Sequence, residues 1–266
     1  MPEADARSRF DSCAGRALGV LVDSRTQSPK RLLALAYAWS AFAVMWGFWV
    51  CFVIFLADPP WAAKSWPLPT VDTGGSVDHY GIAAMLDLVL IGLFGLQHSV
   101  MARPWFKQRI LGRLPPAFER CTFVHAANVA LFALVVLWQP VPSEVWNIGS
   151  PWREAAWLAF AGGWVILLLG AMSFGVLDLL GIEQMRAWSS GAPPPKPRLK
   201  TGLMYRWLRH PMYVGVLLAM WAAPQMTVGH LLLATGMTLY VLIALRYEER
   251  DLVARFGRSY ARWHTR

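Results

Sequence analysis

Long apolar segments constrain the fold of this chain more than any other feature of its 266 residues. Four of them lie at Leu32–Ala57, Tyr80–Met101, Cys121–Trp138 and Ala155–Leu180. Each is long enough for an α-helix, which rises about 1.5 Å per residue, to cross a hydrocarbon layer of about 30 Å. Hydrophobic residues make up 56% of the chain, more than soluble domains carry, and we predict an all-α, polytopic integral membrane bundle.

A fifth apolar stretch, residues 213–245, is too long for a single crossing. As one straight helix it would extend about 50 Å. Pro224 lies within it, and proline cannot continue the hydrogen-bond ladder of a helix. We therefore predict a hairpin of one short and one longer helix. The predicted fold class is a helical bundle of four spans plus a C-terminal helical hairpin.

Lysine and arginine alternate between rich and poor segments along the chain. Five or six of them occur in each of the segments 1–31, 102–120, 181–211 and 246–266, and one occurs in each of 58–79 and 139–154. Because basic loops stay on the cytoplasmic side, we expect a multi-pass protein of the bacterial inner membrane with both termini cytoplasmic. The net charge of +9 then reflects topology and attraction to the lipid bilayer. We expect no nucleic-acid partner, and no protein partner is evident.

Residue spacing excludes several kinds of site. Cys13, Cys51 and Cys121 are far apart and form no Cys-x-x-Cys, so we expect neither disulfides nor structural zinc. No two of the six histidines lie within ten residues of each other, which excludes the paired-histidine helices of metalloproteases, and we expect no metal site. The chain contains no Gly-x-Gly, so any cofactor is expected in a non-Rossmann site.

Three spaced motifs lie in the last sixty residues. They read Arg209-His210-Pro211-x-Tyr213-x-Gly215, Glu248-Glu249 and Phe256-Gly257-x-x-Tyr260. In this order they resemble the isoprenylcysteine carboxyl methyltransferase superfamily of membrane methyltransferases. The resemblance implies that S-adenosylmethionine is the cofactor and lies between the Arg-His-Pro turn and the double-glutamate helix. It also implies a tunnel from the bilayer for the methyl acceptor.

The sequence and its resemblances together predict two sets of site residues. The cofactor-binding set comprises Gln184, Tyr205, Arg209, His210, Tyr213, Gly215, Glu248 and Glu249. The catalytic set comprises His98, Arg209 and Asp178.

Three further segments are similar to a single bacterial branch of this superfamily. They cover residues 95–104, 119–124 and 177–184 and are similar to the methanethiol S-methyltransferases and to the NnrU-like proteins. This resemblance implies a small thiol as the acceptor, with methanethiol converted to dimethyl sulfide. Glu183 stands where an arginine is expected in that branch, which reverses a charge. The alternatives are a methyltransferase for a lipid-like carboxylate or amine and a non-catalytic NnrU-like membrane module.

The proline-rich segment Ser189–Lys200 predicts a stiff, extended linker. It follows the four-span bundle, residues 32–180. The remainder, 181–266, is expected to contain the cofactor-binding loop, the hairpin and a cytoplasmic C-terminal helix. We expect residues 1–31 to form a cytoplasmic N-terminal segment; they lack the apolar region of a signal peptide, and we expect no cleavage there.

Each candidate residue also has a purely structural interpretation. Arg209 can hold the cofactor's carboxylate or anchor the end of a span. His98 can orient and deprotonate a thiol, or it can brace the helix bundle. Gly215 allows close approach of a ligand or of a neighbouring helix. Asp178, near the expected end of the fourth span, is costly there unless it is paired.

The two glutamates of the Glu248-Glu249 motif are expected to have different roles. Adjacent residues on a helix point about 100° apart, so the two carboxylates cannot face the same way. Arg246 and Arg250 lie close enough on the same helix to pair with Glu249 at the surface. The sequence leaves open which glutamate faces the cofactor.

Overall fold

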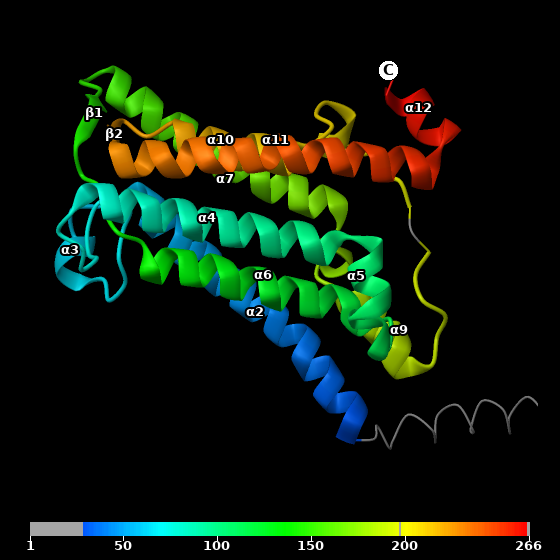
Figure 1. Ribbon diagram of the computed structural model, residues 1–266. Coiled ribbons are helices and arrows are strands. Elements are labelled where there is room, and N and C mark those ends of the chain that lie inside the picture. The colour runs from blue at the N-terminus through cyan, green and yellow to red at the C-terminus, as the bar shows by residue number, and fades with distance from the viewer. Residues whose placement is uncertain (1–28, 197, 265–266) are drawn as a thin grey trace, which may run out of the picture.

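The computed structural model describes residues 29–196 and 198–264 as a bundle of long helices (Figure 1). In this part of the chain five helices are long and apolar enough to cross a membrane: α2 (Pro29–Ala57), α4 (Tyr80–Ala102), α6 (Phe118–Leu137), α7 (Trp152–Phe174) and α11 (Val228–Phe256). A shorter apolar helix, α10 (Pro211–Trp221), precedes α11. These helices confirm the prediction of an all-α, polytopic membrane fold.

Short elements connect the long helices. They are α3 (Ala62–Ser65), α5 (Pro104–Arg109), η1 (Leu111–Arg113), α8 (Val176–Leu179), α9 (Ile182–Ser190), η2 (Leu203–Arg206) and α12 (Arg258–His264). Two short strands, β1 (Glu144–Asn147) and β2 (Gln225–Thr227), form a two-stranded antiparallel sheet. The predicted cytoplasmic N-terminal segment, including Cys13, lies almost entirely outside the described residues.

The helical hairpin breaks where the sequence predicts. Helix α10 ends at Trp221, and Pro224 and strand β2 follow. Thr227 then caps α11, because its side chain accepts a hydrogen bond from the backbone N–H of His230 at 3.1 Å. Strand β2 pairs with β1, so the turn of the hairpin is joined to the connection between α6 and α7. The sequence did not predict this small sheet.

The fourth apolar run does not remain helical to Leu180 as expected. Helix α7 ends at Phe174, because Gly175 adopts a backbone φ of 99°, which favours glycine. The short helix α8 then carries Asp178. This break moves Asp178 off the spanning helix and onto a separate turn.

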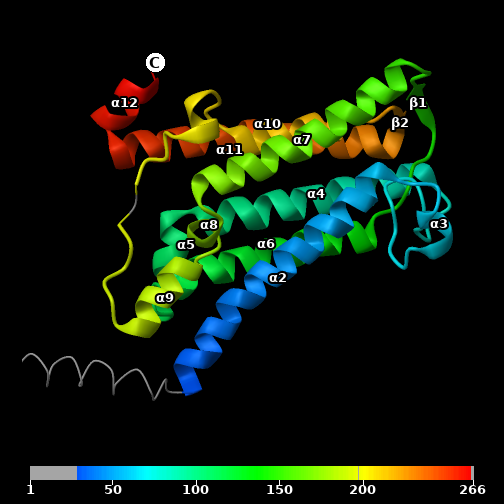
Figure 2. The same cartoon turned by 180° about the vertical axis from the view of Figure 1, so that it is seen from behind.

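The hairpin packs directly against the other spans. Helix α10 lies along α7, and α11 lies along α4 (Figure 2). At the crossing of α10 and α7, a Cβ atom added to Gly215 would lie 2.5 Å from the backbone nitrogen of Leu167. Small residues at such a crossing let two helices approach closely, which is how spans associate in lipid.

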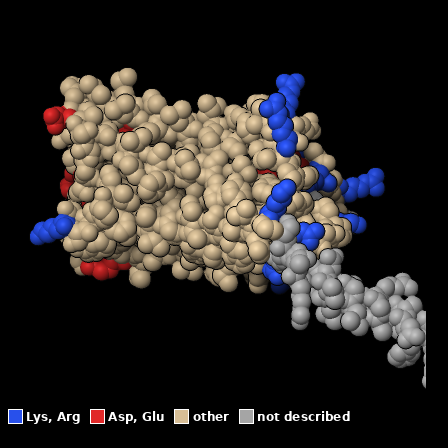
Figure 3. Space-filling model, turned by 90° about the horizontal axis from the view of Figure 1, so that it is seen from below, with Lys and Arg blue, Asp and Glu red and all other residues tan. Residues whose placement is uncertain are grey.

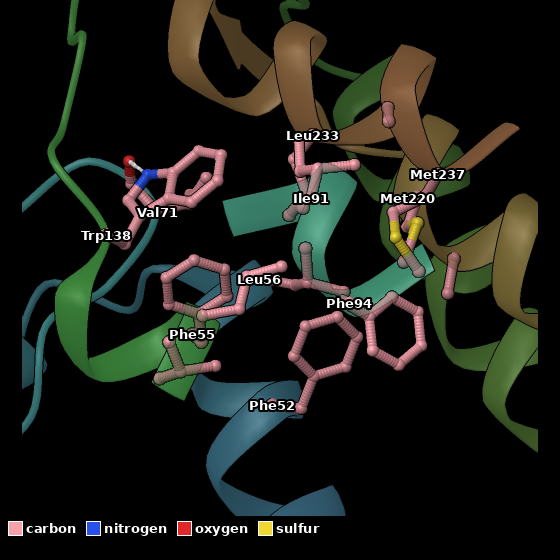
Figure 4. Packing of buried hydrophobic residues seen from close by; sticks show 14 of the residues in the cluster. Phe52, Phe55, Leu56, Val71, Ile91, Phe94, Trp138, Met220, Leu233 and Met237 are labelled. Atoms are coloured by element: carbon pink, nitrogen blue, oxygen red, sulfur yellow. Dashed lines mark hydrogen bonds between the residues drawn. The ribbon is translucent and has the colours of Figure 1, made fainter. Parts of the chain in front are cut away.

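The centre of the bundle is filled by aromatic and aliphatic side chains (Figure 4). Phe52 and Phe55 of α2 stack on each other, and the ring of Phe55 meets the edge of Trp138. The buried indole N–H of Trp138 donates a hydrogen bond to the backbone oxygen of Val71 at 3.1 Å. The core therefore also ties down the loop between α2 and α4.

The two ends of the bundle differ in charge. One end carries α5, α9, α12 and the extended segment after α9, whereas the other carries α3, β1 and β2 (Figure 1). Lys and Arg side chains gather mainly at the first end in the view of Figure 3. The segregation of basic residues along the sequence is thus a segregation in space.

Candidate active site

A cleft of about 230 Å³ opens at the basic end of the bundle. One wall comes from α8, α9 and residues 195, 196 and 198–200, and the other comes from the turn before α10 and from α11 and α12. Six of the predicted site residues line it: Asp178, Gln184, Tyr205, Arg209, His210 and Glu248. The fold therefore gathers residues from positions 178 to 248 into one space.

The Arg-His-Pro turn forms one corner of the cleft. His210 precedes Pro211 and has φ −128° and ψ 64°, outside the helical region that a following proline disfavours. Pro211 occupies the first position of α10, where its missing N–H costs nothing. The His210 ring stacks on Tyr213, with ring centroids 5.8 Å apart. The turn thereby holds Arg209 and His210 at the start of α10, beside the cleft.

The two glutamates of α11 have different partners. Glu249 Oε1 lies 2.6 Å from Nε2 of His210, and its Oε2 accepts a hydrogen bond from the hydroxyl of Tyr260 at 2.6 Å. Glu248 Oε2 accepts a hydrogen bond from the hydroxyl of Tyr213 at 2.8 Å. Glu248 lines the cleft, whereas Glu249 links the Arg-His-Pro turn to α12. The structure therefore favours Glu248 as the acid that meets a ligand.

Two tyrosines at this end retain their protons near neutral pH. Burial, together with the nearby charge of Glu248, raises the pKa of Tyr205 to about 12. Burial and the hydrogen bond to Glu249 also raise the pKa of Tyr260. The Tyr260 hydroxyl donates its hydrogen to Glu249, and the Tyr205 hydroxyl likewise keeps its hydrogen for donation.

Asp178 is the centre of an ionic cluster on the opposite wall. Its Oδ1 accepts hydrogen bonds from Arg120 and Gln184, both at 2.8 Å, and its Oδ2 lies 3.4 Å from Nζ of Lys200. The guanidinium of Arg120 also donates to the backbone oxygen of Asp178 at 2.7 Å. These contacts offset the free-energy cost of placing a charged carboxylate near the membrane. It also fixes Asp178 between two cations, which suits a positioning role better than proton abstraction.

Arg120 and Lys200 were not among the predicted site residues. Arg120 begins a span and Lys200 ends the linker, so each looks like an ordinary basic residue at a membrane surface. Both nevertheless line the cleft and neutralise Asp178. An arginine inside the first turn of an apolar helix was the available signal for Arg120.

His98 lies in the bundle on α4 and is not among the residues that line the cleft. Its ring lies between those of Phe123 and Tyr240, with centroids 4.6 and 6.1 Å away. Its Nδ1 is buried and has no hydrogen-bond partner among the described residues. The ring nitrogen is thus held in an apolar environment with its hydrogen-bonding capacity unused.

Gly215 and Tyr213 also lie outside the lining of the cleft. Gly215 faces the backbone of α7, where an added Cβ would be 2.6 Å from the oxygen of Gly163. Its position fits the interpretation as a helix contact. Tyr213 reaches the site indirectly, because its hydroxyl group donates to Glu248.

The comparisons with known proteins agree with this architecture. Residues 157–259 match a family model described as phospholipid methyltransferase. The methanethiol S-methyltransferase of Mycobacterium tuberculosis is 41% identical over 70% of this chain and 78% of its own length. That of Pseudomonas sp. is 43% identical over 67% and 69%, and methanethiol S-methyltransferase 2 of Bradyrhizobium diazoefficiens is 37% identical over 89% and 88%.

This chain belongs to the methanethiol S-methyltransferase family. It is therefore a membrane methyltransferase, and the non-catalytic alternative is not favoured. The family model covers α7 to α12, the part that contributes most of the cleft. No solved structure matches the chain significantly.

Proposed function

We propose that this enzyme transfers a methyl group from S-adenosylmethionine to methanethiol and releases dimethyl sulfide. The observation that carries the proposal is the cleft between the Arg-His-Pro turn and the double-glutamate helix, where Arg209 and Glu248 face the same space. The names of the relatives support the small thiol as acceptor.

The residues of the cleft fit this cofactor by their chemistry. S-adenosylmethionine carries a carboxylate, an ammonium group and a nucleoside, and supplies when bound a methyl group activated on a cationic sulfur. Arg209 offers a guanidinium for the carboxylate, and Glu248 offers a carboxylate for the ammonium group or the ribose. Aromatic side chains such as Phe256 supply apolar surface for the nucleoside.

The contribution of the protein to the reaction is mainly positional. In-line transfer requires that the acceptor sulfur be held on the far side of the methyl group, and correct orientation lowers the barrier substantially. The Glu249, His210 and Tyr260 contacts fix the turn that carries Arg209. In the bundle, His98 has an unpaired Nδ1 among apolar rings, where it can orient a thiol and accept its proton.

We further propose that the enzyme lies in the bacterial inner membrane with both termini cytoplasmic. The concentration of Lys and Arg at the end that carries the cleft supports this orientation. It gives the cleft access to a cytosolic cofactor, while an apolar thiol enters from the bilayer. Reporter fusions after Arg266 should read as cytoplasmic, and fusions within 139–154 should read as periplasmic. A periplasmic C-terminus would contradict the orientation.

A headspace measurement tests the acceptor. Membranes that contain the enzyme are given methanethiol and S-adenosylmethionine, and dimethyl sulfide is measured by gas chromatography. We expect dimethyl sulfide to form only when both reactants are present. Radioactive methyl label that instead enters the lipid fraction would favour the runner-up, a methyltransferase for a lipid-like carboxylate or amine. Membranes without the enzyme are the control.

A further inference from the structure

The side-chain amide of Gln184 is held in one orientation. It lies on α9 at the wall of the cleft, and its Nε2 donates a hydrogen bond to Oδ1 of Asp178 at 2.8 Å. An ionised carboxylate only accepts hydrogen bonds, so the amide nitrogen has to face Asp178. The amide oxygen is consequently directed away from Asp178.

The oxygen Oε1 of Gln184 is buried and has no hydrogen-bond partner among the described residues. Buried polar atoms are nearly always paired in folded proteins, because losing water without gaining a partner is unfavourable. Gln184 lines the cleft, so a molecule bound there can supply the missing donor. The geometry therefore calls for an N–H or O–H group on the ligand.

The charges around Gln184 favour a neutral donor. Asp178 contributes one negative charge, whereas Arg120 and Lys200 contribute two positive charges against the same carboxylate. An ammonium group placed here would meet net positive charge, and like charges repel strongly where water is scarce. The ammonium group is better accommodated near Glu248 on the opposite wall.

Two neutral donors of the cofactor remain, the ribose hydroxyls and the exocyclic amine of adenine. Ribose hydroxyls typically pair with a carboxylate, which Glu248 provides. Side-chain amides are the groups that recognise adenine through its amine. We propose that Oε1 of Gln184 accepts a hydrogen bond from the adenine amine and so selects an adenine nucleoside. This inference rests on the proposed use of S-adenosylmethionine.

The test measures binding of two ligands to purified protein by calorimetry. One is S-adenosylhomocysteine, and the other is its purine analogue, which lacks only the amine. Wild-type protein should bind the adenine form about 10- to 100-fold more tightly, because the analogue leaves a buried acceptor unpaired. In Gln184→Met this preference should shrink to about twofold or less. Gln225→Met, an exposed residue at the far end, should keep the wild-type preference.

Each other outcome contradicts a different statement. A preference for adenine that persists in Gln184→Met overturns the role of Gln184 and leaves the cofactor in place. Two further analogues test the other donors: one lacks the α-amino group of the amino acid, and the other lacks the ribose 2′-hydroxyl. If Gln184→Met keeps the adenine preference but no longer discriminates against one of these analogues, Gln184 is assigned to the ammonium group or to the ribose. Wild-type protein that binds neither nucleoside contradicts the cofactor itself.

A second variant serves if Gln184→Met does not fold. Gln184→Glu retains an acceptor oxygen at the same position, although it loses the donor to Asp178. We expect this variant to bind more weakly but to keep the adenine preference. Equal binding of the two ligands by Gln184→Glu would overturn the proposal.

Discussion

The two ends of the helix bundle use polar side chains in different ways. At the end with β1 and β2, polar groups bond to one another: Thr70 donates to Asp58, and Thr227 donates to Asp72, each at 2.5 Å. At the cleft end, Asp178 and Glu248 also have partners, but they and their neighbours line a space open to a ligand. The first network closes loops beside a second cavity of about 340 Å³, whereas the second network surrounds the candidate binding site.

Helix α11 runs from one end of the bundle to the other and takes part in both networks. Its first turn is capped by Thr227, whose hydroxyl group is itself held by Asp72. Its last turns carry Glu248 and Glu249, which connect to the Arg-His-Pro turn and α12. We therefore expect the network around Thr227 and Asp72 to govern stability, and the network around Glu248 and Glu249 to govern binding and rate. Matched substitutions at the two ends can break or sharpen this division.

The largest effect is expected from a pair of arginine substitutions. Arg209→Ala should lower methyl transfer about 10³-fold or more, because a charge positioned against the bound cofactor is worth that much in rate. Arg153→Ala, at the other end, removes hydrogen bonds to Ile148 and Asn147 and should leave the rate per folded molecule unchanged. Initial rates and calorimetric affinity for S-adenosylhomocysteine provide the measurement.

The outcome for Arg209 separates binding from catalysis. Weakened affinity for S-adenosylhomocysteine in Arg209→Ala places the residue at the cofactor. Unchanged affinity together with a low rate would remove it from cofactor binding and leave it in catalysis. An equal loss of rate in Arg153→Ala would break the proposed division between the two ends.

A pair of histidines gives the next largest contrast. Among the described residues Nδ1 of His98 is buried without a hydrogen-bond partner, whereas the buried Nε2 of His230 lies 2.9 Å from the backbone oxygen of Met220. His98→Ala should lower turnover roughly 10²-fold, the usual scale for a lost general base, with little change in cofactor affinity. His230→Ala should lower the melting temperature and keep the rate per folded molecule.

The pH dependence of the methyl-transfer rate shows whether His98 acts as a base or only packs the helix bundle. Raising the pH supplies more thiolate from solution, so the rate of His98→Ala should recover partly toward that of the wild type. A variant with a lower melting temperature and no recovery would assign His98 to packing. A fully active variant whose rate does not change with pH would leave another group or a water molecule as the base.

The spans and six of the residues that line the cleft were predicted from the sequence. Apolar length and Pro224 determine where helices can lie, and both signals are local. The motif residues Arg209, His210 and Glu248 were identified through the resemblance, and they line one cleft. Local patterns and a known motif therefore suffice for the spans, the hairpin and part of the candidate site.

Contacts between distant segments were not accessible in the same way. Arg120 pairs with Asp178 only because α6 packs near α9, and β1 pairs with β2 only because the hairpin turn folds back. The division of work between Glu248 and Glu249 depends on which face of α11 meets the Arg-His-Pro turn. No periodicity in one segment encodes such a choice, because it is made by the packing of several helices.

The smallest predicted effect concerns Asp72, at the end with β1 and β2. Burial raises the pKa of Asp72 from 3.8 to about 6, despite the hydrogen bond from Thr227 that favours its charged form. A raised folded-state pKa means that folding favours the protonated acid. The contribution of Asp72 to stability is therefore present below about pH 4 and is lost as the pH rises through about 6.

Asp72→Asn tests this sign directly. The amide stays neutral and can still accept the hydrogen bond from Thr227, so the cost of burying a charge disappears. We expect the melting temperature to rise by about 2 °C above about pH 7, and to change little near about pH 4. The rate per folded molecule should stay at the wild-type value, since Asp72 belongs to the network that closes loops. A lower melting temperature at neutral pH would mean that the charge of Asp72 itself stabilises the cap of α11. A lower rate per folded molecule would mean that this end of the bundle also contributes to catalysis.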